Sequence, residues 1–269
     1  MKYTHNYMKI FLDTADTDII EKYFSTGLVD GVTTNPTLIM KSGKNPDDVY
    51  QKIKDIGVKD ISMEVMGNFV EMYTEASRLS QKFGDVATIK VPMTRDGLKV
   101  CHQLSQVDKV RVNVTLIFSL SQAVLAAKAG ATYVSPFVGR LDDQSVAGLE
   151  VVRSISDMYR IHRIPTQVLS ASIRSVQRAV RSWYNGAEVV TMPPNVFEQM
   201  YDHILTDKGM EIFEKDWAEG TYAIRNLIMK NDDEIVRAYS MASFPAEGKK
   251  ICLLYTSDAA DEGLGVDLG

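Results

Sequence analysis

A lysine inside an apolar segment is the residue with the clearest potential for chemistry. Lys90 lies in Ala87–Pro92, a β-branched run closed by proline, and this pattern predicts a strand. Strand alternation places Lys90 on the face opposite Ile89 and Val91. A buried ammonium is costly unless it is paired or loses its proton, and only the neutral amine attacks a carbonyl. Lys90 is therefore either a nucleophile or a residue whose stem crosses the strand while its head reaches water.

Polar side chains also stand at the ends of other apolar segments. In each case the flanking residues are typical of a core, so these polar groups are not ordinary solvent-exposed side chains. The carboxyl ends of parallel strands share one edge or mouth of a fold, which would bring such groups together. The candidates at these positions are Asp13, Thr33, Thr34, Asn35, Glu64, Asn113, Thr115, Ser135, Arg140, Ser172 and Arg174.

Each candidate also has an ordinary structural interpretation. Asp13 could cap the helix that follows, and Asn35 before Pro36 could belong to a turn. Thr115 could fill the core as a β-branched residue, and Arg140 could bridge to a nearby aspartate in a solvated loop. One position alone does not decide between these interpretations. A lysine, two carboxylates, hydroxyls and two arginines at one site favour chemistry.

The elements that must position these residues are short strands alternating with helices. Amphipathic stretches such as 69–83 and 175–184 separate the strands. Eight such units with buried strands predict an α/β fold of the (β/α)8 barrel type, with its chemistry at the carboxyl ends of the strands. An open doubly wound sheet is the alternative, but its GxGxxG fingerprint is absent. The predicted strands are 9–14, 31–35, 60–65, 87–92, 111–117, 133–138, 166–172 and 189–193.

The barrel pattern predicts one domain over residues 8–220 and a C-terminal extension over 221–269. A helix is expected at 208–217 near the end of the barrel, and another at 223–241 in the extension. From Phe244 onward the chain is polar and weakly patterned, so no fold is assigned to it. Residues 252–262 resemble a translated sequencing adapter, and we expect the natural chain to end before them.

Composition excludes several classes of protein. Of 269 residues, 45% are hydrophobic and 24% charged, which is typical of a soluble globular protein. The net charge of -5 without a basic arm argues against a nucleic-acid partner. No apolar run of membrane-spanning length and no leader peptide are recognised, and two cysteines fit a reducing cytoplasm. The four histidines are scattered, so we expect no metal site.

The candidate residues suit an imine mechanism on a ketose. Lys90 would form a Schiff base with the ketone, while Glu64 and Thr115 could hold a water for the proton transfers. Asp13 is the natural base for the hydroxyl at C4, and the protonated imine would accept the electrons of the broken bond as an enamine. Neither metal nor cofactor is required by this chemistry.

The remaining candidates suit a phosphorylated sugar as the partner molecule. Arg140 and Arg174, with the Ser172 hydroxyl, could bind a terminal phosphate. Asn35 and Asn113 could bond sugar hydroxyls through one donor and one acceptor each. The expected substrate-binding residues are Thr34, Asn35, Asn113, Ser135, Phe137, Arg140, Ser172 and Arg174.

Seven ordered segments give the chain a family resemblance, and they are FLDTAD, GVTTNPTL, MEVM, TIKVPMT, NVTLIFSLSQA, SPFVGR and FEKDW. It resembles the transaldolase family, near its short microbial-type members and the related fructose-6-phosphate aldolases, over residues 8–217. The resemblance implies a class I enzyme on a (β/α)8 barrel, with Lys90 as Schiff-base residue and Asp13 as acid/base. It also implies that Glu64 and Thr115 hold the catalytic water, that Asn35, Asn113 and Ser135 contact the dihydroxyacetone portion, and that Arg140, Ser172 and Arg174 hold the phosphate.

Two positions separate the reactions that this family implies. By resemblance, transaldolases carry the residues seen here as Glu64 and Phe137, whereas the aldolases carry Gln and Tyr. The expected function is transfer of a dihydroxyacetone unit between sugar phosphates. Cleavage of fructose 6-phosphate is the alternative within catalysis, and a non-catalytic sugar-phosphate-binding barrel is the alternative outside it. Short relatives form pentamers or decamers, so a homo-oligomer is expected.

Overall fold

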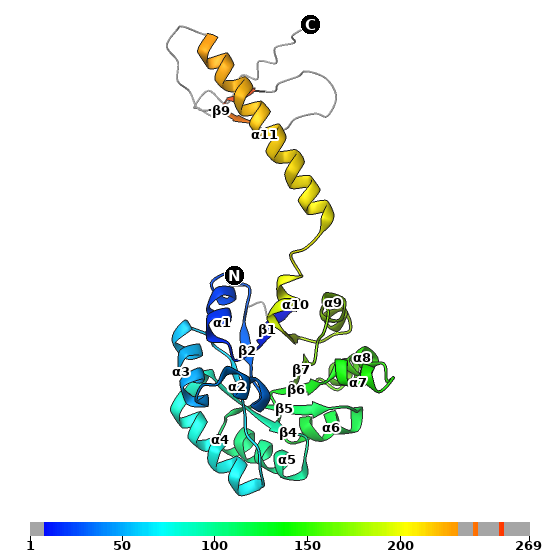
Figure 1. The fold of residues 1–269 in the computed structure, drawn as a ribbon. Helices are drawn as coiled ribbons and strands as arrows, with labels where there is room; N and C mark the ends of the chain where they lie inside the picture. The colour runs from blue at the N-terminus through cyan, green and yellow to red at the C-terminus, as the bar shows by residue number, and fades with distance from the viewer. Residues whose placement is uncertain (1–7, 231–238, 242–252, 256–269) are drawn as a thin grey trace. The chain divides into compact units, whose positions relative to one another are not determined.

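The computed structural model describes residues 8–230, 239–241 and 253–255, with side chains up to residue 220. Eight parallel strands form a closed barrel, in which β1 pairs with both β2 and β8 (Figure 1). This confirms the predicted (β/α)8 barrel, and every predicted strand is present with ends that differ by at most two residues. The strands are β1 (Lys9–Asp13), β2 (Gly31–Thr33), β3 (Ile61–Glu64), β4 (Ala87–Pro92), β5 (Arg111–Ile117), β6 (Tyr133–Pro136), β7 (Gln167–Ser170) and β8 (Val189–Met192).

Helices follow the strands and surround the barrel, as Figure 1 shows. The start of the helix at 69–83 is fixed by a capping box: Asn68 Oδ1 accepts from the Glu71 backbone N–H, and the Glu71 carboxylate accepts from the Asn68 N–H. Such local signals explain why the predicted bounds of this helix agree with the structure. The helices are α1 (Thr17–Phe24), α2 (Pro36–Ser42), α3 (Pro46–Ile56), α4 (Phe69–Phe83), α5 (Arg95–His102), α6 (Leu120–Lys128), α7 (Val138–Asp143), α8 (Gly148–Ile161), α9 (Val176–Tyr184) and α10 (Pro194–Glu198).

An apolar layer fills the interior of the barrel below its carboxyl end. Phe11, Tyr133, Leu169 and Val189 are buried and pack together there. Gly31 makes room for this layer, because a Cβ on Gly31 would lie 2.6 Å from the Phe11 ring. The polar side chains of the next layer, towards the carboxyl end, pack on this apolar layer.

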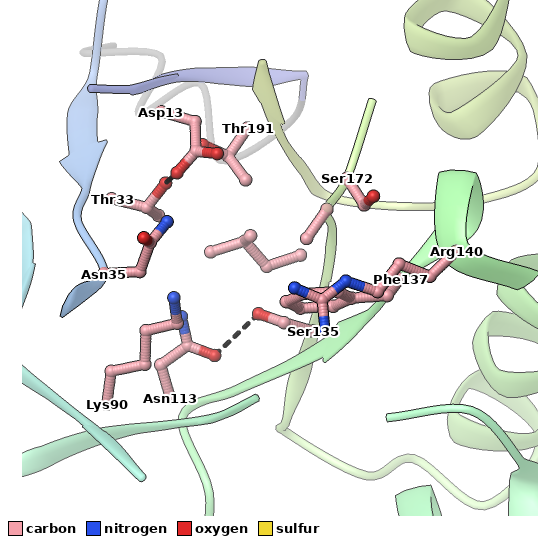
Figure 2. A pocket seen from close by; sticks show the side chains of 12 residues that line it. Asp13, Thr33, Asn35, Lys90, Asn113, Ser135, Phe137, Arg140, Ser172 and Thr191 are labelled. Carbon is pink, nitrogen blue, oxygen red and sulfur yellow. Dashed lines mark hydrogen bonds between the residues drawn. The ribbon is translucent and has the colours of Figure 1, made fainter. Parts of the chain in front are cut away.

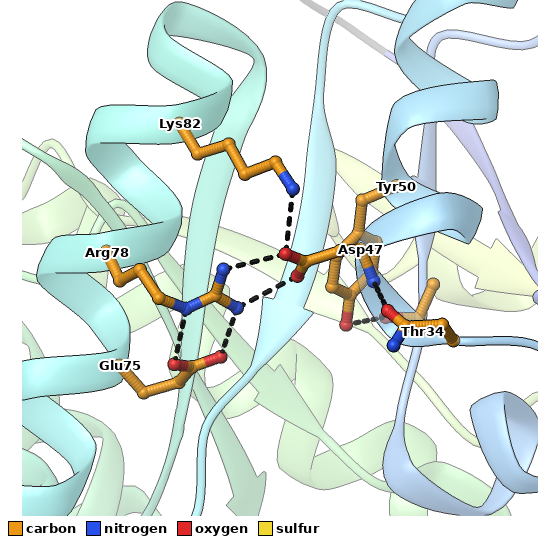
Figure 3. A network of polar contacts seen from close by, with 7 residues as sticks. Thr34, Asp47, Tyr50, Glu75, Arg78 and Lys82 are labelled. Atoms are coloured by element: carbon orange, nitrogen blue, oxygen red, sulfur yellow. Dashed lines mark hydrogen bonds and ion pairs between the residues drawn. The ribbon is translucent and has the colours of Figure 1, made fainter.

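An ion-pair network ties α3 to α4 on the outside of the barrel (Figure 3). Arg78 donates to both carboxylate oxygens of Asp47, over 2.7 and 2.8 Å, and also to Glu75. Lys82 adds a bond of 2.8 Å to the same aspartate. These charge-assisted bonds hold the pKa of the Asp47 carboxyl well below its usual range. The network fixes the two helices that flank β3.

The chain divides into two compact units between Asp202 and His203, whereas the predicted boundary lay at residue 220. The second unit contains α11 (Ile204–Lys230) and an antiparallel pair of β9 (Tyr239–Met241) with β10 (Leu253–Tyr255). The helix predicted at 208–217 lies within α11. Among the described residues, no helix, α11 included, combines the length and apolar character that a membrane span needs.

The separate helix predicted for 223–241 is wrong in its bounds. Helix α11 is continuous through this start, because Gly220 is the weakest helix former near it and one glycine costs only about 1 kcal/mol. Residues 239–241 are in strand β9. The rest of that prediction, at 231–238, lies outside the described residues. So do the stretch from Phe244 and the adapter-like segment, apart from β10.

Candidate active site

Lys90 stands at the centre of the carboxyl end of the barrel. Its Nζ lies 2.9 Å from Glu64 Oε2 and donates to the backbone oxygen of Thr34 over 3.0 Å. Glu64 and Lys90 are register partners on β3 and β4, so both side chains point into the barrel. The side chains of Lys90 and Glu64 are only 6% and 9% exposed, respectively. The Lys90 head is therefore buried and paired, and does not reach bulk water.

Two cavities meet at the Lys90 amine. The first, of about 120 Å³, contains Asp13, Asn113 and Ser135 (Figure 2). The second, of about 350 Å³, contains Glu64 and Thr115. Asn35, Lys90, Phe137 and Arg140 line both cavities. The amine thus has one carboxylate on each side.

Asp13 faces the first cavity and is free of helix capping. Asp16 caps α1 instead, since its Oδ1 accepts from the backbone N–H groups of Asp18 and Ile19. Asp13 keeps some exposed surface towards the cavity, but the protein surrounds its carboxylate closely. Desolvation raises the pKa of Asp13, while the Lys90 charge and the Thr33 hydrogen bond oppose that rise. Asp13 is thus a stronger base than an ordinary aspartate.

Thr115 presents a hydroxyl that has no protein partner. Its Oγ1 is buried and makes no hydrogen bond to the described residues, although it lines the same cavity as Glu64. Buried hydroxyls normally have a partner, so an unpartnered one beside a cavity is suited to bind a water molecule. The next residue, Leu116, has a left-handed φ of 63°, and the β5–β6 register shifts there. This irregularity interrupts the β5–β6 ladder at Thr115, which stays paired with β4. Such irregularities are common near active sites.

Amide side chains line the wall of the first cavity. Ser135 Oγ donates to Asn113 Oδ1 over 2.7 Å, the bond drawn in Figure 2, and Asn113 Nδ2 donates to Ser62. Asn35 Oδ1 accepts from the Leu38 N–H and caps α2. Asn35 is therefore a helix cap and not part of an isolated turn, and its amide nitrogen remains available to the cavity that it lines.

Arg140 supplies the positive charge at the mouth of both cavities. Its guanidinium carbon lies 5.0 Å from the centre of the Phe137 ring, which orients it as a cation–π pair. Among the described residues, Arg140 forms no salt bridge with Asp142 or Asp143. Asp142 pairs with Arg178, and Asp143 pairs with Arg174.

Ser172 and Arg174 stand at the edge of the site in different ways. Ser172 lines the first cavity and has a left-handed φ of 57°. The backbone at Ser172 packs against Gly139, where a Cβ would lie 2.4 Å from the Ser172 carbonyl oxygen. Arg174 instead binds both oxygens of Asp143 and shares a neighbouring cavity of about 530 Å³ with Arg140.

Comparisons with known proteins identify the family of this chain. The family model described as Transaldolase/Fructose-6-phosphate aldolase matches residues 10–240. This chain belongs to the transaldolase/fructose-6-phosphate aldolase family. A protein named "Probable transaldolase" from Chelativorans sp. (strain BNC1) is 49% identical over 213 residues, which cover 79% of this chain and 97% of that protein. A "Probable transaldolase" from Caulobacter vibrioides (strain NA1000 / CB15N) is 48% identical over 212 residues, covering 78% and 97%.

A solved structure shares the fold without close sequence similarity. A flavocytochrome b2 with sulfite bound superposes with a TM-score of 0.53 at 11% identity, covering 70% of this chain and 57% of that chain. At this identity the likeness concerns the barrel alone. The transaldolase/fructose-6-phosphate aldolase family is therefore identified by the sequence matches, and the resemblance noted from the seven segments is confirmed.

Two expected site residues of this family member lie apart from the Lys90 cavities. The Thr34 hydroxyl donates to the Ser62 carbonyl over 2.9 Å and lies 3.3 Å from the Tyr50 hydroxyl, on the outer face of the barrel (Figure 3). Only its backbone oxygen reaches Lys90. Arg174 lines the neighbouring cavity, not the first one. The other expected residues line one or both of the Lys90 cavities.

Thr33 and Thr191 also line the first cavity. Thr33 is one of the strand-end candidates but has no expected substrate role, and Thr191 is not among those candidates. The signal that identifies them is the two-residue alternation of the strands. Asp13 and Thr33 are register partners, so Thr33 faces inward and Thr34 outward. Likewise Val189 belongs to the interior layer, so Thr191 two residues later also faces inward.

Proposed function

We propose that this protein is a transaldolase that transfers a dihydroxyacetone unit between sugar phosphates through a Schiff base on Lys90. The proposed reaction converts sedoheptulose 7-phosphate and glyceraldehyde 3-phosphate into erythrose 4-phosphate and fructose 6-phosphate. One observation carries the proposal: a buried lysine amine lies between two cavities, with Glu64 in one and Asp13 in the other. Membership of the family supports the proposed reaction. We also propose that the protein is a homo-oligomer in the cytoplasm.

The first half of the mechanism forms the imine. Lys90 gives a proton to Glu64, and its neutral nitrogen attacks the C2 carbonyl carbon of the ketose. A water held by Glu64 and Thr115 carries a proton from the attacking nitrogen to the carbonyl oxygen, giving a neutral carbinolamine. Glu64 then protonates the hydroxyl, which leaves as water, and a protonated imine remains. The unpartnered Thr115 hydroxyl supports this role, because a water there would satisfy it.

The second half breaks and remakes a carbon–carbon bond. The Asp13 carboxylate takes the proton of the C4 hydroxyl, the bond between C3 and C4 breaks, and its electrons enter the imine to form an enamine. The aldose phosphate leaves, and the aldehyde of the acceptor takes its place. The enamine carbon attacks that aldehyde while Asp13 returns its proton to the new hydroxyl. Hydrolysis of the imine then releases the product and regenerates Lys90.

The proposed binding groups follow the length of the substrate. Asn35, Asn113 and Ser135 would contact the dihydroxyacetone portion, since their polar groups line the small cavity beside Lys90. Arg140 and Ser172 would hold the phosphate at the mouth of that cavity. Arg174 would join them by turning from Asp143, while Thr34 would act through its backbone oxygen by holding the Lys90 amine.

Dependence on an acceptor tests this function. The purified chain is incubated with fructose 6-phosphate, with and without erythrose 4-phosphate, and products are separated by ion-exchange chromatography. We expect sedoheptulose 7-phosphate only when the acceptor is present. Release of free dihydroxyacetone at the same rate without acceptor would instead assign the aldolase reaction. Absence of any product in both incubations would assign a non-catalytic binding barrel.

Phe137 offers a second way to separate transfer from cleavage. A Tyr hydroxyl at this position could protonate the enamine and release it, whereas Phe137 has no proton to give. Phe137→Tyr should therefore raise the release of free dihydroxyacetone by roughly tenfold. Phe118→Tyr is the matched control, because its ring lies 6.0 Å from that of Phe137 but outside the Lys90 cavities. Equal release by both variants would contradict the role of Phe137.

A further inference from the structure

Three side chains on neighbouring strands form a hydroxyl chain that ends on Asp13. Thr33 Oγ1 donates to Asp13 Oδ1 over 2.8 Å, and Thr191 Oγ1 lies 2.6 Å from Thr33 Oγ1. The residues come from β1, β2 and β8, and all line the first cavity (Figure 2). Thr33 and Thr191 are 2% and 3% exposed, so bulk water does not compete for their hydroxyls.

The direction of this chain follows from counting protons. An ionised carboxylate only accepts, and each hydroxyl has one proton to donate. Thr33 uses its proton in the bond to Asp13, so the contact with Thr191 requires Thr191 to donate to Thr33. We propose that Thr191 is a positioning residue that acts through Thr33 to favour the ionised, proton-accepting form of Asp13. This inference rests on the proposed function, in which Asp13 takes a proton from the substrate.

Each protonation state of Asp13 keeps both hydrogen bonds within the chain. When Asp13 holds the substrate proton, it can donate to Thr33, which then donates to Thr191, and the Thr191 proton turns to the cavity. No proton enters or leaves the pair of hydroxyls, because only their orientations reverse. Polarisation by Thr191 strengthens the bond from Thr33 to the carboxylate, since successive hydrogen bonds reinforce one another. Thr191 therefore tunes Asp13 without touching it.

The charged groups that surround Asp13 are not altered by changing Thr191. Lys90 lies across the first cavity and attracts the ionised carboxylate. The other charged side chains lining the cavities that contain Asp13 are Asp16, Asp18, Lys41, Lys44 and Arg140. Because threonine is uncharged, replacing Thr191 changes the titration of Asp13 only through the hydroxyl chain and local packing.

The pH profile of Thr191→Val tests the inference. Loss of the donor should move the acid limb of kcat/KM to higher pH by roughly half a unit, because the chain contributes part of one charge-assisted bond. Thr191→Ser keeps the hydroxyl and should restore the wild-type limb. Thr191→Ala removes the hydroxyl with different packing and should repeat the shift, so the test survives if the valine variant folds poorly. Coincident profiles for wild type, Val and Ala would overturn the proposal.

A double-mutant cycle shows whether Thr191 acts through Thr33. Thr33→Val should shift the acid limb further than Thr191→Val, because it removes the direct donor to Asp13. In the Thr33→Val background, Thr191→Val should add no further shift. Shifts that add in full would mean that Thr191 acts on the site by another route, and would overturn the chain.

Borohydride trapping separates failure of this inference from failure of the proposed function. Thr191→Val retains Lys90 and Glu64, so it should give the same covalent adduct with fructose 6-phosphate as wild type. Wild type that neither turns over nor forms an adduct would overturn the function and this inference together. Wild type and variant that both form adducts, with unchanged acid limbs, would overturn the hydroxyl chain alone.

Discussion

The two ends of the barrel carry similar polar groups, but these groups differ in whether protein partners satisfy their hydrogen bonds. Before β3, at the amino end, the Asp60 carboxylate accepts from Thr88 over 2.7 Å, from Arg111 over 2.6 Å and from Tyr133 over 2.9 Å. At the carboxyl end of β3, Glu64 pairs with Lys90 beside two cavities. Both sites therefore contain a carboxylate, a cation and hydroxyls, and they lie one strand length apart.

The difference lies in what remains unsatisfied. Around Asp60 the donors are all occupied, and burial next to that carboxylate raises the pKa of the Tyr133 hydroxyl so that it stays a donor. Around Lys90 the Thr115 hydroxyl has no partner among the described residues, and Asp13 is ionisable but desolvated. The same side-chain types thus stabilise the fold at one end and remain available for a ligand at the other.

The largest expected effect comes from exchanging the carboxylate at each end for an amide. Asp13→Asn removes the proposed base, so turnover should fall by roughly 10²–10⁴-fold. The free energy of unfolding should rise by roughly 0.5–2 kcal/mol at neutral pH, because a desolvated charge is removed. Steady-state assays and thermal or urea unfolding measure the two quantities.

The matched control is Asp60→Asn. This change breaks the pair with Arg111 and should lower the free energy of unfolding by roughly 2–3 kcal/mol, a modest loss for a buried pair because Arg111 is partly exposed. Turnover of the folded protein should stay within about threefold of wild type. Loss of activity without loss of stability in Asp60→Asn would remove the distinction between the two ends.

The pH dependence of stability sharpens the same contrast. The pKa of Asp13 is raised in the folded state, so the folded protein binds this proton more tightly than the unfolded chain does. The stability gained by Asp13→Asn should therefore have its full size above the pKa of Asp13 in the folded protein. The gain should disappear as pH falls from that pKa towards the lower pKa of Asp13 in the unfolded chain. Urea unfolding of both proteins across the acid range measures this difference. A gain that grows towards low pH would have the wrong sign.

A pair of threonines gives the smallest expected effects. Thr115→Val removes a hydroxyl without a protein partner, so stability should change by less than about 0.5 kcal/mol while turnover falls by roughly 10–100-fold. Thr88→Val removes a donor to Asp60 and should cost about 1–2 kcal/mol of stability, with turnover nearly unchanged. Melting curves and activity assays on the two variants measure stability and turnover. Equal changes of stability and turnover in Thr115→Val and Thr88→Val would contradict the comparison.

The sequence was sufficient for the barrel because its signals are local and repeated. Strand alternation, capping residues such as Asn68 and proline at Pro92 each act within a few residues. The same alternation, applied strictly, would also have placed Thr33 inward in preference to Thr34. Most of the candidate residues at the strand ends line the two Lys90 cavities, because a barrel brings those ends to one mouth.

Contacts between distant residues were beyond sequence patterns. Nothing local indicates that Arg174 binds Asp143 while Arg140 lies over Phe137, because these choices depend on how α7 meets the turn after β7. The bond between Thr33 and Thr191 joins residues 158 positions apart and depends on closure of the barrel. The length of α11 also escaped prediction, because the change of composition after Ala218 suggested a boundary although no strong helix breaker lies there.

Reductive trapping of Lys90 tests the central claim most directly. The full chain is incubated with fructose 6-phosphate and borohydride, digested, and mapped by mass spectrometry, with Lys90→Met as control. We predict one covalent adduct per chain, on Lys90, and none in the variant, whose far-ultraviolet circular dichroism should match wild type. An adduct on another lysine, or none on a wild-type protein that is turning over substrate, would contradict the assignment of Lys90 as the imine-forming residue.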